Sequence, residues 1–177
     1  VGQRVPAYLL VPRHQPKPMP AMVALHQCAG DCTDAKEAVV GKAPWVPIDR
    51  QTSYFETDGR VHIDRTDQAY GYELVHEGFV VLAPDSINCG ERNIEAIRKP
   101  GEVRLCHRII DPHLGKASEF KRLIDGVRAV DLLQSLDFVD SDRVGAIGHS
   151  MGAGGVYWLM AFDERVKAGI MGSRHEA

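Results

Sequence analysis

Short runs of hydrophobic residues alternate along the chain with stretches in which hydrophobic residues recur every three to four positions. The short runs predict β-strands, and the longer periodic stretches predict α-helices. Several runs carry no polar position at all, which is typical of strands that are buried on both faces of a parallel sheet. Strands are predicted at residues 5–11, 21–25, 79–83, 144–147 and 166–171, and helices at residues 67–77 and 151–162.

A further long helix is predicted to begin after Ser118, which is its expected N-cap. Its hydrophobic positions keep the spacing of one helix face. They are Phe120, Leu123, Ile124, Val127, Val130 and Leu133. Strands that alternate with helices indicate an α/β fold, here an open, mostly parallel twisted sheet with helices on both faces. Ligands of such sheets bind at the carboxyl ends of the strands.

The connections between these elements are rich in helix breakers. The N-cap of the helix at residues 67–77 is expected at Thr66 or Asp67, and Gly78 is expected to end that helix. A polar stretch at residues 86–117 predicts a loop or lid. The other predicted connections are a proline-rich turn at 12–20, a short helix within 29–41, an irregular excursion at 42–64 with a turn at Asp58-Gly59, and a turn at 140–142.

Length and charge narrow the range of functions. With 177 residues and no internal repeat, residues 1–177 are expected to form a single domain. A net charge of −3 and a pI near 6.2 give no electrostatic reason to expect a nucleic-acid partner. The hydrophobic runs are far shorter than the ~20 residues that span a bilayer, so no membrane partner is expected either.

No cofactor or metal is expected from the sequence. Four cysteines are too few for a disulfide framework, and the pair Cys28 and Cys32 lacks the second close pair of a zinc site. The glycines at 152, 154 and 155 do not complete a dinucleotide fingerprint, because the last glycine is missing and the run lies inside a predicted helix.

One pentapeptide carries the candidate chemistry, Gly148-His149-Ser150-Met151-Gly152. It lies between a predicted strand and a predicted helix, which is the setting of the nucleophile elbow in α/β-hydrolases. Glycines two positions before and after the serine leave out Cβ atoms that would clash in so sharp a turn. Ser150 is therefore the predicted catalytic nucleophile, although a structural glycine-rich turn would have the same sequence.

The segment after the strand at residues 21–25 is the predicted source of the second half of the site. An oxyanion hole combines the amide that follows the nucleophile with one from another strand end. The backbone N–H groups of Cys28 and Met151 are the predicted pair, with Gln27 as the alternative to Cys28. His26 is expected to brace this loop, and an ordinary strand-end loop is the other interpretation.

Four segments together resemble the dienelactone hydrolase-like and acetyl xylan esterase-like α/β-hydrolases. They are Leu25-His-Gln-Cys28, Gly78-Phe-Val-Val-Leu-Ala-Pro-Asp85, Arg128-Ala-Val-Asp-Leu-Leu-Gln-Ser-Leu136 and Asp142-Arg-Val-Gly-Ala-Ile-Gly-His-Ser-Met-Gly152. The resemblance runs from about Val5 to Gly172. It implies hydrolysis of a small carboxylic ester through an acyl-enzyme on Ser150. Dienelactone hydrolases proper carry a cysteine nucleophile, so the serine places this chain nearer the esterases.

The acid and the histidine of a catalytic triad follow the serine in this fold. Only residues 172–177 follow the last predicted strand, and the candidates there are His175 and Glu176. The expected explanations are a fragment, a minimal hydrolase that recruits another base, or a catalytically silent relative. The alternative to a serine esterase is therefore a silent binding or interaction domain on the same scaffold.

Two surface features complete the predictions. A last strand at residues 166–171 would leave an apolar edge, and such edges favour association, so a homo-oligomer through this edge is expected. The stretch from Arg92 to Lys116 carries six basic and three acidic side chains. It could attract an anionic substrate, or it could be an ordinary solvated surface.

Overall fold

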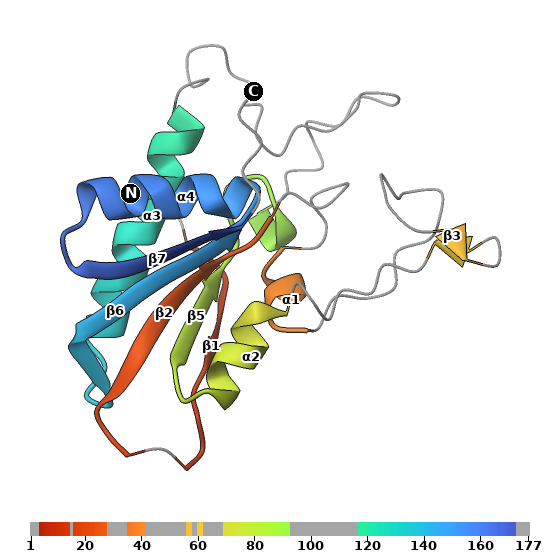
Figure 1. Cartoon of the computed structure of the whole chain (residues 1–177). Helices are drawn as coiled ribbons and strands as arrows, with labels where there is room; N and C mark the ends of the chain where they lie inside the picture. Colours follow the sequence, from red (N-terminus) through yellow and green to blue (C-terminus); the bar gives the residue numbers. More distant parts are fainter. Residues whose placement is uncertain are drawn as a thin grey trace.

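The computed structural model of the chain describes residues 4–14, 16–27, 35–41, 56–57, 60–61, 69–92 and 117–172. Its centre is a five-stranded sheet with the strand order β1-β5-β2-β6-β7 (Figure 1). The strands are β1 (Ala7–Leu10), β2 (Met19–Leu25), β5 (Val80–Pro84), β6 (Val139–His149) and β7 (Val166–Gly172). β1 runs antiparallel to β5, and the other neighbours run parallel. The predicted open, mostly parallel sheet is confirmed.

Two pairs of helices cover the sheet. Helices α1 (Lys36–Val39) and α2 (Tyr70–His76) lie on one face, and α3 (Ala117–Gln134) and α4 (Met151–Phe162) lie on the other (Figure 1). Successive residues of a strand point to opposite faces. In β5, Val80 and Leu82 therefore join the core under α3 and α4, whereas Val81 and Ala83 join the core under α1 and α2. Burial on both faces explains why these strands are continuously hydrophobic.

Several predicted boundaries hold. Helix α4 has the predicted bounds, and β2, β5 and β7 differ from the predictions by one or two residues at an end. Gly78 follows α2 with a positive φ of 92°, a backbone conformation that glycine adopts without strain. Inside the predicted irregular excursion, β3 (Glu56–Thr57) pairs antiparallel with β4 (Arg60–Val61), on either side of the predicted Asp58-Gly59 turn.

Helix α2 begins later than predicted, at Tyr70, with Ala69 in the N-cap position and no side-chain cap. The expected caps Thr66 and Asp67 lie outside the described residues. The first turn of α2 packs closely against α1, because a Cβ on Gly71 would come within 2.8 Å of the Val39 side chain. Tertiary packing of this kind supplies most of the stability of a short helix.

Two predictions at the ends of other elements are wrong. Helix α3 begins at Ala117, so Ser118 lies inside its first turn and not before it. Residues 140–142 belong to β6, because the pairing with β2 resumes after an irregularity in register.

The hydrophobic stripe of α3 is buried only in part. Val130 and Leu133 are fully buried, but Phe120 is 62% exposed and Ile124 38% exposed. The N-terminal part of α3 projects past the carboxyl edge of the sheet (Figure 1), where no described strand lies beneath it. Near this end Arg122 and Asp125 are buried instead.

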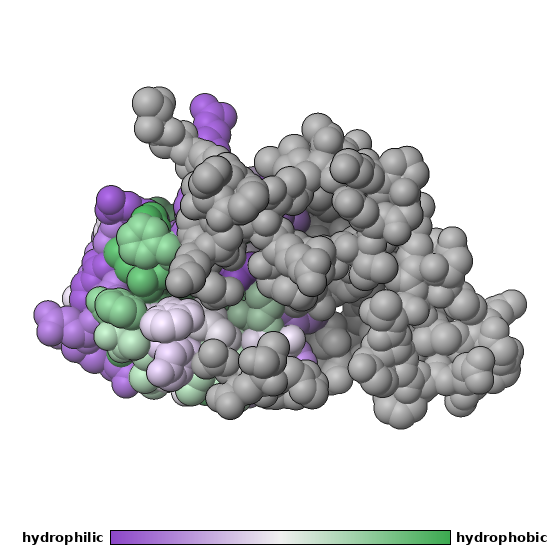
Figure 2. All heavy atoms as spheres, turned by 90° about the horizontal axis from the view of Figure 1, so that it is seen from above, coloured by the Kyte–Doolittle hydropathy of each residue, from purple (hydrophilic) through white to green (hydrophobic). Residues whose placement is uncertain are grey.

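β7 forms one edge of the sheet and, within the described residues, pairs only with β6. Hydrophobic side chains are exposed on β7 and on the neighbouring helix α4. They are Tyr157, Met160, Phe162, Ile170 and Met171. Hydrophobic residues also gather in Figure 2 on the side where α4 and β7 lie in Figure 1. Association of two copies through this edge stays a prediction.

Residues 93–116, most of the predicted lid, lie outside the described residues. Their place within a single domain therefore stays a prediction. In the part of the chain that is described, no helix has both the length and the apolar character to cross a membrane.

Candidate active site

Ser150 occupies the turn between β6 and α4, at the carboxyl edge of the sheet. Its backbone has φ 52° and ψ −114°, a conformation that non-glycine residues rarely adopt and that costs about 1–3 kcal/mol. The flanking elements hold it there. The Ser150 N–H donates to the Gly172 carbonyl at 2.9 Å, and the Ser150 carbonyl accepts the first helical hydrogen bond, from Gly154 N–H at 3.2 Å. Such strain is characteristic of a serine nucleophile at a strand-to-helix turn.

The two glycines of the pentapeptide are required by close backbone contacts. A Cβ on Gly148 would overlap the backbone of Gly152, and a Cβ on Gly152 would overlap the carbonyl oxygen of Leu25. The turn is thus packed against itself and against the end of β2, whose Leu25 pairs with Gly148. The steric role expected for both glycines agrees with this geometry.

Met151 is the first residue of α4, so its backbone N–H belongs to the first turn, whose amides have no partner within the helix. The amide therefore lies next to Ser150 at the positive end of the helix dipole. Cys28, the predicted source of the second amide, lies outside the described residues. The assignments of Ser150, Cys28 and Met151 to catalysis stay predictions.

His26 follows β2 and is almost completely buried. Its Nε2 accepts a hydrogen bond from the Ser86 N–H at 2.9 Å, and its Nδ1 lies 2.7 Å from the Gln27 carbonyl. Burial lowers the pKa of His26, which favours the neutral ring. In the neutral ring, Nδ1 carries the hydrogen and donates a hydrogen bond to the Gln27 carbonyl. His26 therefore braces the loop between two strand ends, as expected.

The other histidines in the described part of the chain are His14, His76 and His149. The His149 ring lies beside β7, where a Cβ on Gly172 would come within 3.0 Å of its Nδ1. No hydrogen bond joins the Ser150 hydroxyl to a described histidine. The predicted candidates His175 and Glu176 lie outside the described residues.

A cluster of charged side chains lies beside His26, with Lys36 and Asp85 buried at its centre. Lys36 Nζ is 2.7 Å from Asp85 Oδ2 and 2.7 Å from Glu91 Oε1. The Lys36 and Asp85 side chains are only 2% and 0% exposed. Burial opposes the charge on Lys36, but the hydrogen bonds to Asp85, Glu91 and Glu37 outweigh it and raise the pKa of the ammonium group above its usual range.

Backbone groups complete the contacts of the Asp85 carboxylate. The N–H groups of Lys36 and Glu91 donate to it at 3.2 and 3.0 Å. Gly90, with a φ of 55°, makes room for it, because a Cβ there would overlap the carboxylate. The chain after β2 and the chain after β5 are thus joined by one ion cluster.

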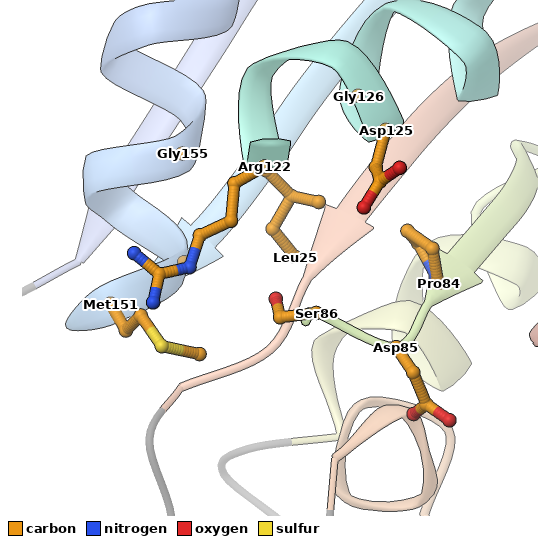
Figure 3. Close-up of a pocket in the computed structure, with 10 residues that line it drawn as sticks. Leu25, Pro84, Asp85, Ser86, Arg122, Asp125, Gly126, Met151 and Gly155 are labelled. Atoms are coloured by element: carbon orange, nitrogen blue, oxygen red, sulfur yellow. The ribbon is translucent and has the colours of Figure 1, made fainter. Parts of the chain in front are cut away.

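A pocket opens between the carboxyl ends of the strands and helices α3 and α4, next to Ser150. Arg122 and Asp125 reach it from α3, and Met151 reaches it from the first turn of α4 (Figure 3). Gly152 of the same turn also lines it. The other lining residues are Leu25, Pro84, Asp85, Ser86, Gly126 and Gly155. Among the described residues, no group of three or more histidine, cysteine or acidic side chains is placed to hold a metal ion. Cys28 and Cys32 lie outside the described residues, so this finding does not include them.

The sequence prediction assigned no role to Lys36, Tyr70, Asp85, Arg122 or Asp125. Asp85 could have been found, because it comes directly after a buried strand at the edge where ligands bind. Arg122 and Asp125 carry a weaker signal, charged side chains three residues apart on an otherwise periodic helix. Lys36 and Tyr70 carry none, because their partners are far away in the sequence.

Comparison with known proteins agrees with this geometry. A protein-family model described as "Dienelactone hydrolase family" matches residues 61–171, more than half of the chain. A curated Bacillus subtilis (strain 168) protein named "Putative hydrolase YtaP" is 27% identical over 165 residues, which cover 93% of this chain and 46% of that protein. The chain therefore spans less than half the length of this curated relative.

Solved structures share the fold. One described as a "putative acetyl xylan esterase" from Bacteroides fragilis NCTC 9343 has a TM-score of 0.66 at 17% identity. The match covers 92% of this chain and 39% of the esterase chain. The acetyl xylan esterase from Paenibacillus sp. R4 has a TM-score of 0.57 at 18% identity, with 93% and 43% covered. At these identities the similarity shows the α/β-hydrolase fold alone. Together with the family match over residues 61–171, it establishes that the chain belongs to the dienelactone hydrolase family.

Proposed function

We propose that this chain carries the nucleophile of a serine hydrolase that cleaves small carboxylic esters through an acyl-enzyme on Ser150. The backbone of Ser150 is the observation that carries the proposal. A serine with φ 52° and ψ −114° between a buried strand and a helix is held in strain, and strain of this kind concentrates at functional sites. Membership of a hydrolase family supports the same reaction class.

In the proposed reaction, Ser150 Oγ attacks the ester carbonyl carbon and passes its proton to a base. The carbonyl oxygen becomes an oxyanion, which the backbone N–H groups of Cys28 and Met151 stabilise. The intermediate then expels the alcohol, which takes up the proton. Water attacks the acyl-serine in the same way, releases the acid and regenerates the hydroxyl.

The general base stays a prediction. His175 is the candidate, because it follows β7, the strand that pairs with β6. Glu176 would orient it only after some rearrangement, since the acid precedes the histidine on this fold. Replacement by alanine tests it directly, because a His175→Ala chain that keeps the wild-type rate removes His175 from the mechanism.

The direct test of the nucleophile is hydrolysis of p-nitrophenyl acetate by the wild-type chain and by Ser150→Ala. An acetyl ester is the first choice because two solved structures of this fold are named acetyl xylan esterases. Loss of the nucleophile should lower kcat by about 10³-fold or more. Ser135→Ala is the matched control, since the hydroxyl of this exposed serine, directly after α3, donates to the Leu132 carbonyl at the surface.

Covalent labelling separates a slow enzyme from a silent binding domain. A fluorophosphonate should add one phosphonyl group to the peptide that contains Ser150 and none to that peptide in Ser150→Ala. Equal ester turnover by the wild type and Ser150→Ala, together with no adduct on Ser150, would contradict the proposal and favour a silent binding domain.

A further inference from the structure

Tyr70, the first residue of α2, has a buried hydroxyl to which the proposed reaction gives no role. Its ring packs with Val39 and Val81 in the core under α1 and α2. The hydroxyl reaches the carboxyl end of β2, where it donates a hydrogen bond of 2.5 Å to the Leu25 carbonyl. Burial raises the pKa of Tyr70 above its usual range, and a hydrogen bond with the backbone of His149 offsets part of that rise. The hydroxyl therefore stays protonated and remains a donor.

The Leu25 carbonyl is also the group against which the nucleophile turn packs. Any Cβ on Gly152 would overlap this oxygen, so the backbone of Gly152 lies directly against it. Leu25 and Gly148 are partners in the pairing of β2 with β6. The Leu25 carbonyl thus contacts both Tyr70 of α2 and the turn that carries Ser150.

We propose that Tyr70 is a positioning residue for the nucleophile, because its hydroxyl fixes the Leu25 carbonyl against which the Gly148–Gly152 turn is built. Tyr70 does not touch the reacting atoms and acts through Leu25 and the backbone of His149. The inference rests on the proposed function of Ser150 for its effect on rate, but not for its effect on the turn itself.

A small displacement of this turn matters because the site depends on backbone geometry. Ser150 must present its hydroxyl, and Met151 its amide, to the same carbonyl group of a substrate. Donors of an oxyanion hole act at about 2.7–3.1 Å from the developing charge. A shift of about 1 Å can cost about 100-fold in rate, even when its cause lies away from the chemistry. Tyr70→Phe removes the hydroxyl that donates to the Leu25 carbonyl and keeps the ring in the core.

The experiment compares Tyr70→Phe with two controls in the ester assay. Tyr72→Phe removes the same atom from a tyrosine of the same helix that is 47% exposed. Val39→Ala weakens the same core without touching Leu25, and so reports a merely structural loss. We expect Tyr70→Phe to lower kcat about tenfold or more with KM changed less than about twofold, since the loss affects the transition state and not ground-state binding. Both controls should keep the wild-type kcat per folded chain.

Amide hydrogen exchange of residues 144–155 gives a second result that does not need activity. Exchange in this segment should be about tenfold faster in Tyr70→Phe, since one hydrogen bond that holds the turn is lost, and unchanged in Tyr72→Phe. A Tyr70→Phe chain whose kcat and exchange match those of Val39→Ala overturns the inference. If Ser150→Ala hydrolyses the ester as fast as the wild type, the proposed function fails, and exchange alone then decides: faster exchange at the turn supports the role of Tyr70, and unchanged exchange overturns it.

Discussion

The turn between β6 and α4 and the turn after β5 lie at the same edge of the sheet, but different interactions hold them. At the β6–α4 turn, Gly148 and Gly152 let three backbone segments approach more closely than side chains would allow. After β5, Asp85 is surrounded by Lys36, by backbone N–H groups and by the space that Gly90 leaves. The β6–α4 turn depends on the lack of side-chain atoms at Gly148 and Gly152. The turn after β5 depends on the paired charges of Lys36 and Asp85.

This difference predicts opposite sensitivities. An added methyl group should disrupt the β6–α4 turn, because backbone atoms cannot move away as a flexible side chain can. A removed charge should disrupt the turn after β5, because it leaves a buried partner without compensation. Three substitutions test the comparison, one in each turn and one at His26, which bonds to the chain after β5. They follow in order of expected effect.

The largest effect is expected for Gly152→Ala. The new methyl group would overlap the Leu25 carbonyl, so the free energy of unfolding should fall by more than about 3 kcal/mol. Gly154→Ala is the matched control on the same helix, because a Cβ there meets nothing within 4 Å. That variant should be more stable than the wild type by about 0.5–1 kcal/mol, since alanine is the better helix former. Urea unfolding measures both, and similar values for the two variants would contradict the steric account.

Asp85→Asn should lower the free energy of unfolding by about 3 kcal/mol, since it leaves the buried Lys36 ammonium short of one partner. Glu91 and Glu37 still contact Lys36, which keeps the loss near the lower end of the range for broken buried pairs. The double variant Lys36→Met/Asp85→Asn should recover part of that loss.

The control for this charge is Arg128→Ala, which breaks an exposed pair with Asp131. Exposed pairs contribute less than about 1 kcal/mol. An Asp85→Asn chain as stable as Arg128→Ala would show that the buried cluster contributes no more than a surface pair.

The smallest effect concerns His26, which joins the end of β2 to the chain after β5. Burial lowers its pKa in the folded state, so the unfolded chain binds the proton more readily. Stability should therefore be complete above the unfolded pKa of about 6.5 and should decrease as the pH falls below it. His26→Asn should flatten this dependence of unfolding on pH between 5 and 7. The exposed His14→Gln is the control, and an equal slope in wild type and His26→Asn would remove His26 as its source.

Local patterns in the sequence predicted most of the fold. The continuous hydrophobic strands and the bounds of α4 were predictable because they follow from the periodicity of neighbouring residues. The start of α2 was not, because Ala69 in its N-cap position makes no side-chain cap hydrogen bond and so carries no signal in the sequence. Burial was predicted for the whole hydrophobic stripe of α3, but the prediction is correct only towards the C-terminal end, where Val130 and Leu133 are buried. The pattern does not show where the sheet beneath a helix ends.

By itself the sequence determined the strand, the sharp turn and the helix around Ser150, because all the residues that require this arrangement lie within one short segment. Only the tertiary structure decided which groups meet that turn. The Leu25 carbonyl lies against Gly152 and accepts a hydrogen bond from the hydroxyl of Tyr70, 45 residues away in the sequence. Lys36 pairs with Asp85, which is 49 residues away. Hydrophobic periodicity indicates which face of an element is buried. It does not indicate which distant polar atom will lie opposite, because that depends on how the elements are arranged in space.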